Sequence, residues 1–322
     1  MFQLFKKRTF SDYISDTFTF FKENGKHFLT HYFIINGVLL LILLALSYFI
    51  FKVYFEVIFS SIGTGAPNFL EDYFNNNIGL IIGIIFFFVI VLLFVSLISY
   101  AFPIVYLQLF AKHEGSNFET REILELLKAK LSKMIIFFLV LIGLSLTVGF
   151  VFLALIIALM FTFMFAFMFI VIIIPLAIIL IPALIALVQI SFYDYLNEEI
   201  GVFEAFGRGF KKLKQNFWPI TGSTIVMYII IQTVTTIFIA IPYIFGMIQL
   251  FTDVHSQGNP DADTLSFFGV MMVIVMCISI LAGFILNNIL IVNSGIIYYS
   301  LKDQNENISI LSDIDLIGKA DE

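Results

Sequence analysis

The sequence contains few charged residues. Only 12% of the chain is Asp, Glu, Lys or Arg, whereas about a quarter of a soluble domain is charged. This composition argues against a soluble fold and predicts an integral membrane protein. Because ionisable residues inside a membrane mark proton relays and ion-coupled transport, their absence also argues against a proton-coupled transporter, a pump or a protease with an intramembrane acidic dyad. The long runs without any of the four charged residue types are 28–51, 73–111, 134–193, 215–252 and 264–301.

Cysteine is almost absent, because Cys277 is the only one and lies inside an apolar run. A single cysteine excludes an intrachain disulfide and any CxxC metal or redox motif. The sequence also lacks a Ser/His/Asp arrangement, a P-loop and a dinucleotide-binding fingerprint. No basic run is long enough to indicate nucleic-acid binding. We therefore expect no catalytic residues, no cofactor, no metal site, no nucleic-acid partner and no enzymatic activity.

Histidine is scarce and scattered. His113 and His255 fall on opposite predicted faces of the membrane, so the histidines do not form one metal centre. This separation argues against membrane hydrolases, desaturases and carotenoid-cleaving oxygenases built on histidine clusters. His27 and His31 have the i,i+4 spacing that metal ligands use on a helix. Their place beside Lys26, where a predicted surface helix meets a span, favours interfacial polar anchors instead.

What the sequence does have is enough apolar length for several membrane crossings. A transmembrane helix needs about 20 apolar residues to cross about 30 Å of hydrocarbon. The uncharged run 134–193 is too long for one helix and has the length of a hairpin, with its turn near Met160–Phe167. The predicted spans are about 28–51, 78–110, 134–159, 166–193, 217–247 and 266–300.

Basic residues lie on one predicted side of these spans. Cytoplasmic loops retain Lys and Arg, so this bias predicts that both termini are cytoplasmic in a multi-pass protein of the bacterial plasma (inner) membrane. The net basic inner helices suit contact with anionic lipid headgroups. Lys52 is the one basic residue elsewhere; the other 16 of the 17 lie within 1–27, 111–133, 194–216 and 301–322.

An internal repeat is visible in the sequence. Phe21–Phe28 aligns with Leu127–Met134 and with Phe210–Phe217, and each copy is an amphipathic segment leading into a span. Each unit then continues through a second span. The predicted organisation is a single membrane domain, 1–301, and a cytoplasmic tail, 302–322. The repeats cover about 10–111, 117–196 and 201–301.

The segments that open the repeats have helical periodicity. The third carries an aromatic and apolar stripe opposite a basic face, and the second carries Ser116 and Glu119 at the spacing of a capping box. A helix with these opposed faces lies in the membrane interface. The predicted fold is therefore all-α, with six transmembrane helices arranged as three hairpins, each preceded by an amphipathic interfacial helix. The third stripe consists of Phe203, Phe206, Phe210, Leu213 and Phe217.

Two groups of polar residues are candidate functional positions. Basic residues of the surface helices are candidate contacts for lipid headgroups: Lys22, Lys26, Lys128, Lys130, Arg208, Lys211, Lys212 and Lys214. Amides within the spans are candidates for interhelical hydrogen bonds that fix packing, with a polar groove or headgroup site as the alternative. These amides are Gln189, Gln232, Asn287, Asn288 and Asn293.

The stretch from Glu204 to Trp218, with the sequence EAFGRGFKKLKQNFW, resembles a helix that precedes a span in YciC-like bacterial membrane proteins. It is also similar to the membrane domain fused to some glycerophosphodiester phosphodiesterases. The resemblance implies a six-span protein with comparable surface helices. It implies no catalytic residue, because the chain has no phosphodiesterase domain.

Taken together, these patterns predict a non-enzymatic membrane protein. The leading hypothesis is an accessory or scaffold subunit of a membrane protein complex, or a protein that organises the bilayer. The alternative is a transporter or binder of lipid or another hydrophobic substrate. The expected partners are anionic lipids on the cytoplasmic face and a second membrane protein.

Overall fold

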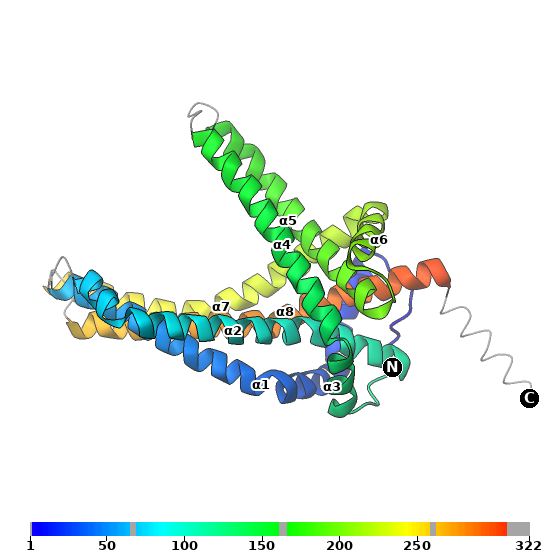
Figure 1. Cartoon of the computed structure of the whole chain (residues 1–322), viewed down its shortest axis with the longest axis horizontal. Coiled ribbons are helices and arrows are strands. Elements are labelled where there is room, and N and C mark those ends of the chain that lie inside the picture. The colour runs from blue at the N-terminus through cyan, green and yellow to red at the C-terminus, as the bar shows by residue number, and fades with distance from the viewer. Residues whose placement is uncertain (1, 65–68, 161–165, 258–261, 308–322) are drawn as a thin grey trace, which may run out of the picture. The chain divides into compact units, whose positions relative to one another are not determined.

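The computed structural model describes residues 2–64, 69–160, 166–257 and 262–307, and within these ranges every regular element is an α-helix (Figure 1). Six of these helices are long and apolar enough to cross a membrane. The prediction of an all-α chain with six spans is confirmed at this level, which indicates a multi-pass membrane protein. The helices are α1 (Phe10–Thr64), α2 (Phe69–Lys112), α3 (Thr120–Ala129), α4 (Leu131–Met160), α5 (Ala166–Asn197), α6 (Val202–Gln215), α7 (Phe217–Gln257) and α8 (Ala262–Glu306).

Helices α4 and α5 occupy the long uncharged run and lie side by side (Figure 1). The ring of Phe137 on α4 stacks on that of Phe192 on α5, with 4.4 Å between centroids. The two helices therefore correspond to the predicted third and fourth spans. Most of the turn predicted near Met160–Phe167, residues 161–165, lies outside the described residues.

The first predicted surface helix differs from the other two. Helix α1 runs without interruption from Phe10 to Thr64, so the amphipathic segment and the first span form one helix. Between α3 and α4, and between α6 and α7, the backbone instead leaves helical geometry at Lys130 and Asn216. Helix α1 contains no proline that would interrupt it where the two segments join. The internal repeat stays a prediction.

The cap of α3 also differs from the prediction. Glu119, rather than Ser116, is the N-cap residue, and its backbone N–H donates to the Glu122 carboxylate at 3.1 Å. The capping box thus begins three residues later than predicted. The chain between α2 and α3 first makes a turn at Glu114, which has a φ of 53°. The extended backbone that an N-cap requires is found after this turn, at Glu119.

Helix α8 extends beyond the predicted end of the membrane domain at residue 301. It continues to Glu306, so Lys302 and Asp303 belong to a helix, and the Asp303 side chain is buried. Most of the predicted tail, 308–322, lies outside the described residues.

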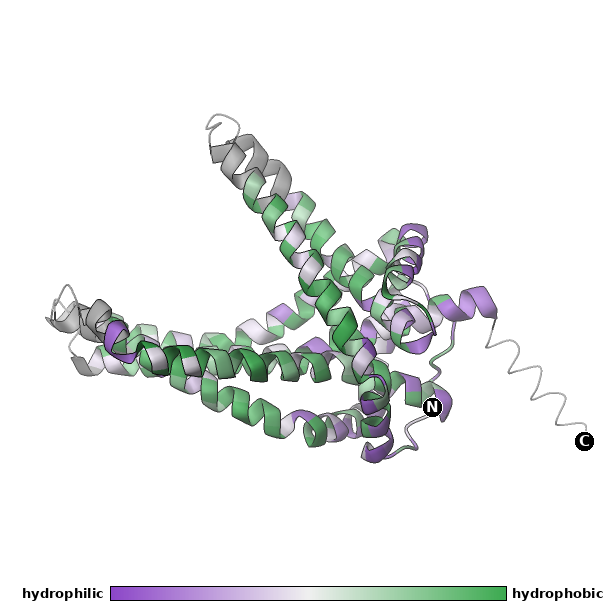
Figure 2. Ribbon diagram, viewed as in Figure 1, coloured by the Kyte–Doolittle hydropathy of each residue, from purple (hydrophilic) through white to green (hydrophobic). Residues whose placement is uncertain are grey.

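The described residues form two compact units. Unit 1 comprises those within Met1–His31, Tyr100–Ile229 and Asn288–Glu322, and unit 2 comprises those within Tyr32–Ser99 and Ile230–Asn287. Helices α1, α2, α7 and α8 contribute residues to both. Figure 2 shows hydrophilic residues in α3, α6 and the end of α8, which belong to unit 1.

An aromatic core holds together α1 and α2 within unit 1. Tyr106 of α2 is fully buried and meets Phe20 and Phe28 of α1 edge to face, with centroids 6.2 and 4.9 Å apart. Phe102 and Phe110 of α2 pack on the same two rings. Such edge-to-face pairs stabilise a core by about 0.5–1.5 kcal/mol each beyond their buried area.

In unit 2, a smaller polar cluster joins α1, α2 and α8. The Tyr32 hydroxyl lies 3.2 Å from Ser99 Oγ and 3.1 Å from the Phe284 carbonyl oxygen. Ser99 in turn donates to Asn36 Oδ1 at 3.2 Å. The helices of unit 2 consist mostly of hydrophobic residues (Figure 2), and many of their large apolar side chains are exposed. The hydrogen bonds give specific contacts that apolar packing alone lacks.

One close helix contact in unit 1 centres on Gly295 of α8. A Cβ atom at this position would overlap the Tyr193 hydroxyl and ring and the Leu107 side chain. We expect Gly295→Ala to lower the free energy of unfolding by about 1–3 kcal/mol, because overpacking forces apart helices that are already in contact. Thermal unfolding of the purified protein in detergent measures this change.

Gly283→Ala is the matched control on the same helix, since nothing lies within 4 Å of its added methyl group. A Gly295→Ala protein as stable as the Gly283→Ala protein would show that the contact is not tight.

Candidate functional site

The carboxyl end of α5 concentrates negative charge. The last carbonyl groups of a helix have no intrahelical partner and carry the negative end of the helix dipole. Asp194 lies in the last turn of α5, and Glu198 and Glu199 follow the helix directly. The end of α5 therefore presents carboxylates and free carbonyl oxygens within a few residues of each other.

Four lysines from other parts of unit 1 converge on this helix end. Lys133 of α4 donates to the Glu198 carbonyl oxygen at 3.1 Å, and Lys302 of α8 donates to the Glu198 carboxylate at 2.6 Å. Lys130 donates to the Leu196 carbonyl oxygen and, at 2.6 Å, to Gln108 Oε1. We call the set Asp194, Glu198, Lys130, Lys133, Lys212 and Lys302 the α5 C-terminal cluster.

The most buried ion pair of the cluster joins α5 to α6. Lys212 Nζ lies 2.7 Å from both carboxylate oxygens of Asp194. The exposed fraction of the Asp194 side chain is 4%, and that of Lys212 is 19%. The same ammonium group lies 4.7 Å from the centre of the Tyr298 ring of α8, a cation–π contact. Lys212 thus connects three helices through one charge.

Burial changes the proton affinity of Lys130, which lies between α3 and α4. Desolvation, together with repulsion from Lys133, lowers the pKa of the Lys130 ammonium group to about 8. Its hydrogen bonds to two oxygen atoms compensate for part of this desolvation. Lys130 therefore bonds within the protein, to Gln108 and Leu196, and its ammonium group is not available to a ligand.

A polar cavity opens between α5, α6 and α8, and four residues of the cluster line it: Asp194, Glu198, Lys212 and Lys302. Its volume is about 330 Å³. Lys211 lies at the cavity and makes no ion pair among the described residues, whereas Arg208 is paired with Glu204 at 2.7 Å. The cavity can accept an anionic group. Its lining consists of the basic residues Arg208, Lys211, Lys212 and Lys302, the acidic residues Asp194, Glu198 and Glu306, and Tyr298 and Asn305.

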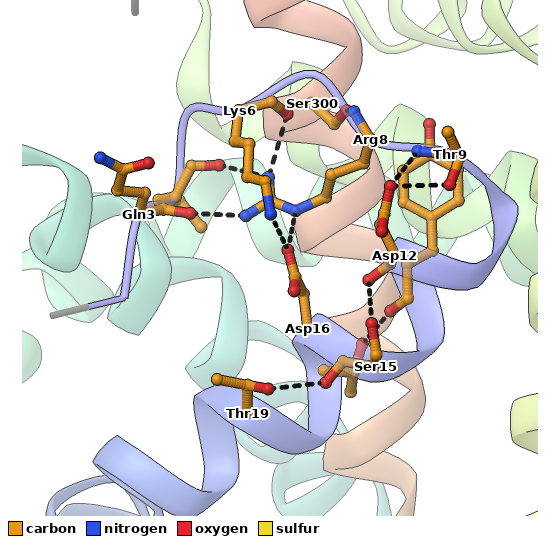
Figure 3. A network of polar contacts seen from close by, with 12 residues as sticks. Gln3, Lys6, Arg8, Thr9, Asp12, Ser15, Asp16, Thr19 and Ser300 are labelled. Carbon is orange, nitrogen blue, oxygen red and sulfur yellow. Dashed lines mark hydrogen bonds and ion pairs between the residues drawn. The ribbon is translucent and has the colours of Figure 1, made fainter.

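A second buried cation organises the N-terminal segment of unit 1 (Figure 3). The Arg8 guanidinium donates to Asp16 at 2.7 Å and to the carbonyl oxygens of Gln3, Leu4 and Lys6, while the Arg8 N–H donates to Ser300 Oγ at 3.0 Å. Burial lowers the pKa of Arg8 from its ordinary value, and Asp16 opposes that shift. These bonds fold residues 3–8 around Arg8 and attach them to α8.

The predicted headgroup contacts differ in their surroundings. Lys130 and Lys212 are half-buried and bonded to protein oxygens. Of the predicted contacts, Arg208, Lys211 and Lys212 line the cavity. The remaining exposed lysines do not line it; they are Lys22 and Lys26 on α1, Lys128 on α3 and Lys214 on α6.

Two of the predicted intramembrane amides form bonds between helices. Asn293 of α8 donates to the Tyr13 carbonyl oxygen at 2.9 Å and accepts from Ser223 of α7 at 3.2 Å. Gln189 of α5 accepts a hydrogen bond from Ser294 of α8. The other three are dispersed: Asn288 is buried on α8, Asn287 is half-buried beside it, and Gln232 is exposed on α7.

Comparison of the chain with protein-family models, curated proteins and solved structures found no match. The resemblance of the α6 region to YciC-like proteins and to phosphodiesterase membrane domains therefore stays a prediction. The site has to be interpreted from its own residues.

The sequence did not identify the acidic half of the site. No sequence pattern singles out Asp194 or Glu198, which follow an apolar run. Acidic residues directly after a long span, followed by a basic amphipathic helix, are the signal that could have indicated an ion-paired helix end.

The Asp194–Lys212 pair provides a test of the cluster. Lys212→Met leaves a buried carboxylate without its partner, and we expect the free energy of unfolding to fall by about 3–5 kcal/mol. Replacing both members, as in Lys212→Met with Asp194→Leu, removes the unpaired charge and should restore much of the loss. Unfolding by heat or denaturant in detergent solution measures the stability of the single and the double variant.

Lys214→Met is the control, because Lys214 is exposed on the same helix. The assignment fails if Lys212→Met is no more destabilising than Lys214→Met, or if the two replacements at 194 and 212 are simply additive.

Proposed function

We propose that this protein is a non-enzymatic, accessory or bilayer-organising protein of the bacterial plasma membrane, and that it binds anionic lipid headgroups at its cytoplasmic face. The observation that carries the proposal is the polar cavity bordered by α5, α6 and α8, with Lys211 and Arg208 at its lining.

The size and charge of the cavity suit a phosphate-containing headgroup. Binding sites for small molecules have volumes of about 300–1,000 Å³, and this cavity, at about 330 Å³, is at the lower end of that range. Asp194 and Glu198 are already neutralised by Lys212 and Lys302. The third carboxylate of the lining, that of Glu306, leaves four basic residues against three acidic ones. Lys211, which forms no ion pair among the described residues, is then the cation with capacity for a ligand. Ammonium–phosphate hydrogen bonds are among the strong ones.

The distribution of charge along the chain supports the orientation. The lysines and arginines around the cavity belong to the 16 basic residues on the predicted inner side. Cytoplasmic leaflets are rich in anionic lipids, which attract basic segments next to the membrane. The proposed cavity therefore faces the leaflet that supplies its ligand.

Interhelical bonding favours an organising role over transport. Gln189 and Asn293 use their amide groups on Ser294, Ser223 and Tyr13. Polar groups bonded in this way stabilise packing and do not line a path for a polar headgroup across the membrane. Lipid transport stays the alternative prediction, as does a membrane-protein partner.

The decisive experiment compares lipid binding by the full chain with and without the ammonium group of Lys211. We expect native mass spectrometry of the detergent-solubilised protein to show bound phosphatidylglycerol in preference to phosphatidylcholine. Lys211→Gln should weaken phosphatidylglycerol binding about fivefold, the equivalent of about 1 kcal/mol for one basic residue at the membrane surface.

Lys214→Gln is the matched control, because it removes the same charge from α6 outside the cavity lining. Equal binding of both lipids, or equal loss in the two variants, would contradict a headgroup site in the cavity. Lipid movement between leaflets of reconstituted vesicles would favour the transport alternative instead.

A further inference from the structure

Two imidazoles meet on one face of α1 in unit 1. His27 and His31 lie one helical turn apart, and their Nε2 atoms are 3.0 Å from each other. Both side chains are half-buried, so solvent and small ions reach them. Paired histidines at i and i+4 on a helix are the arrangement with which zinc is bound in helical metal sites.

The other ring nitrogen of each histidine is held by an oxygen atom. His27 Nδ1 lies 2.8 Å from the Tyr106 hydroxyl, and His31 Nδ1 lies 2.5 Å from the Thr120 hydroxyl. Metal-bound histidines almost always form such a bond through the nitrogen that does not bind the metal, and the bond fixes the orientation of the ring. The second layer of a metal site is therefore already in place.

A third donor atom lies at the same point. The Phe118 carbonyl oxygen is 3.2 Å from His27 Nε2. A carbonyl oxygen only accepts, so in the absence of an ion His27 Nε2 carries a proton, and the lone pair of His31 Nε2 faces it. Transfer of that proton to His27 Nδ1, where the Tyr106 oxygen accepts it, leaves lone pairs from both imidazoles and the carbonyl for a cation.

The spacing of the two nitrogens fits a transition-metal ion. With bonds of about 2.0–2.1 Å, two ligand nitrogens are about 3.3 Å apart on a tetrahedral ion and about 2.9 Å apart at a right angle. The observed distance of 3.0 Å lies between these values. The separation of the two nitrogens would thus change by only a few tenths of an ångström on binding.

The available ligand atoms define the kind of metal site. Among the residues that the structure describes, no group of three or more His, Cys, Asp or Glu side chains gathers around one point. The ion would be bound by two imidazoles and one backbone oxygen, with water in the remaining positions. Imidazole ligands favour zinc, copper and nickel over calcium and magnesium.

We propose that His27, His31 and the Phe118 carbonyl form a binding site for a divalent transition-metal ion of the zinc type. The ion would connect α1 to the start of α3, since Phe118 lies just before this helix and Thr120 is its first residue. This proposal replaces the interpretation of the histidines as polar anchors. It is independent of the lipid proposal, because none of these residues lines the cavity.

The test is a calorimetric titration of the full chain in detergent with Zn²⁺ alone, using a purification tag without histidine. We expect one ion per chain. His27→Gln and His31→Gln should each lower the zinc affinity by at least about tenfold, and Thr120→Val, which removes an outer hydrogen bond, should lower it by about tenfold. If His27→Gln does not yield a folded protein, the other two variants carry the test.

His113→Gln is the control, because the His113 Nε2 atom lies 3.0 Å from the Glu122 carboxylate and outside the proposed ligand set. Its zinc affinity should equal that of the unmodified protein. The proposal is overturned if the unmodified protein binds no zinc, or if His31→Gln and Thr120→Val bind it as tightly as His113→Gln does.

Discussion

The polar part of unit 1 depends on the neutralisation of the carboxyl end of α5. A helix that ends with Asp194 and Glu198 beside it has carbonyl oxygens and carboxylates at one place, and their burial is costly unless cations accompany them. Lysines from the α3–α4 junction, α4, α6 and α8 supply those cations. Because each lysine comes from a different part of the chain, this electrostatic requirement also positions α6 and the end of α8.

The same requirement decides which basic residues remain for a ligand. Lys130 and Lys212 are bonded to oxygen atoms of the protein, and Lys302 forms an ion pair with Glu198. Lys211, on the same helix as Lys212, lies at the cavity without an acidic partner among the described residues. A helix whose periodicity places alternate cations inward and outward can therefore stabilise the fold and bind an anion with neighbouring residues.

The spans were predictable because a long uncharged run is a local property of the sequence, and the end of each run lies close to a charged residue. The contacts that build the site join distant residues. Lys130 and Leu196 are 66 positions apart, and Lys302 and Glu198 are 104 apart. Single-sequence periodicity places Lys212 on a basic face but does not show that Asp194 lies opposite. The continuity of α1 was missed because the amphipathic and apolar segments have different compositions, although both are helical.

The central claim is the proposal that the α5 C-terminal cluster and the cavity face the cytoplasm. Labelling of single cysteines with a membrane-impermeant maleimide tests it most directly, in a Cys277→Ser background. Lys211→Cys reports on the cavity. Asn75→Cys reports on α2 at a residue that is exposed and on the predicted outer side. The account predicts that Asn75→Cys reacts in cells without an outer membrane barrier, and that Lys211→Cys reacts only after the plasma membrane is disrupted. Labelling of Lys211→Cys in intact cells would contradict it.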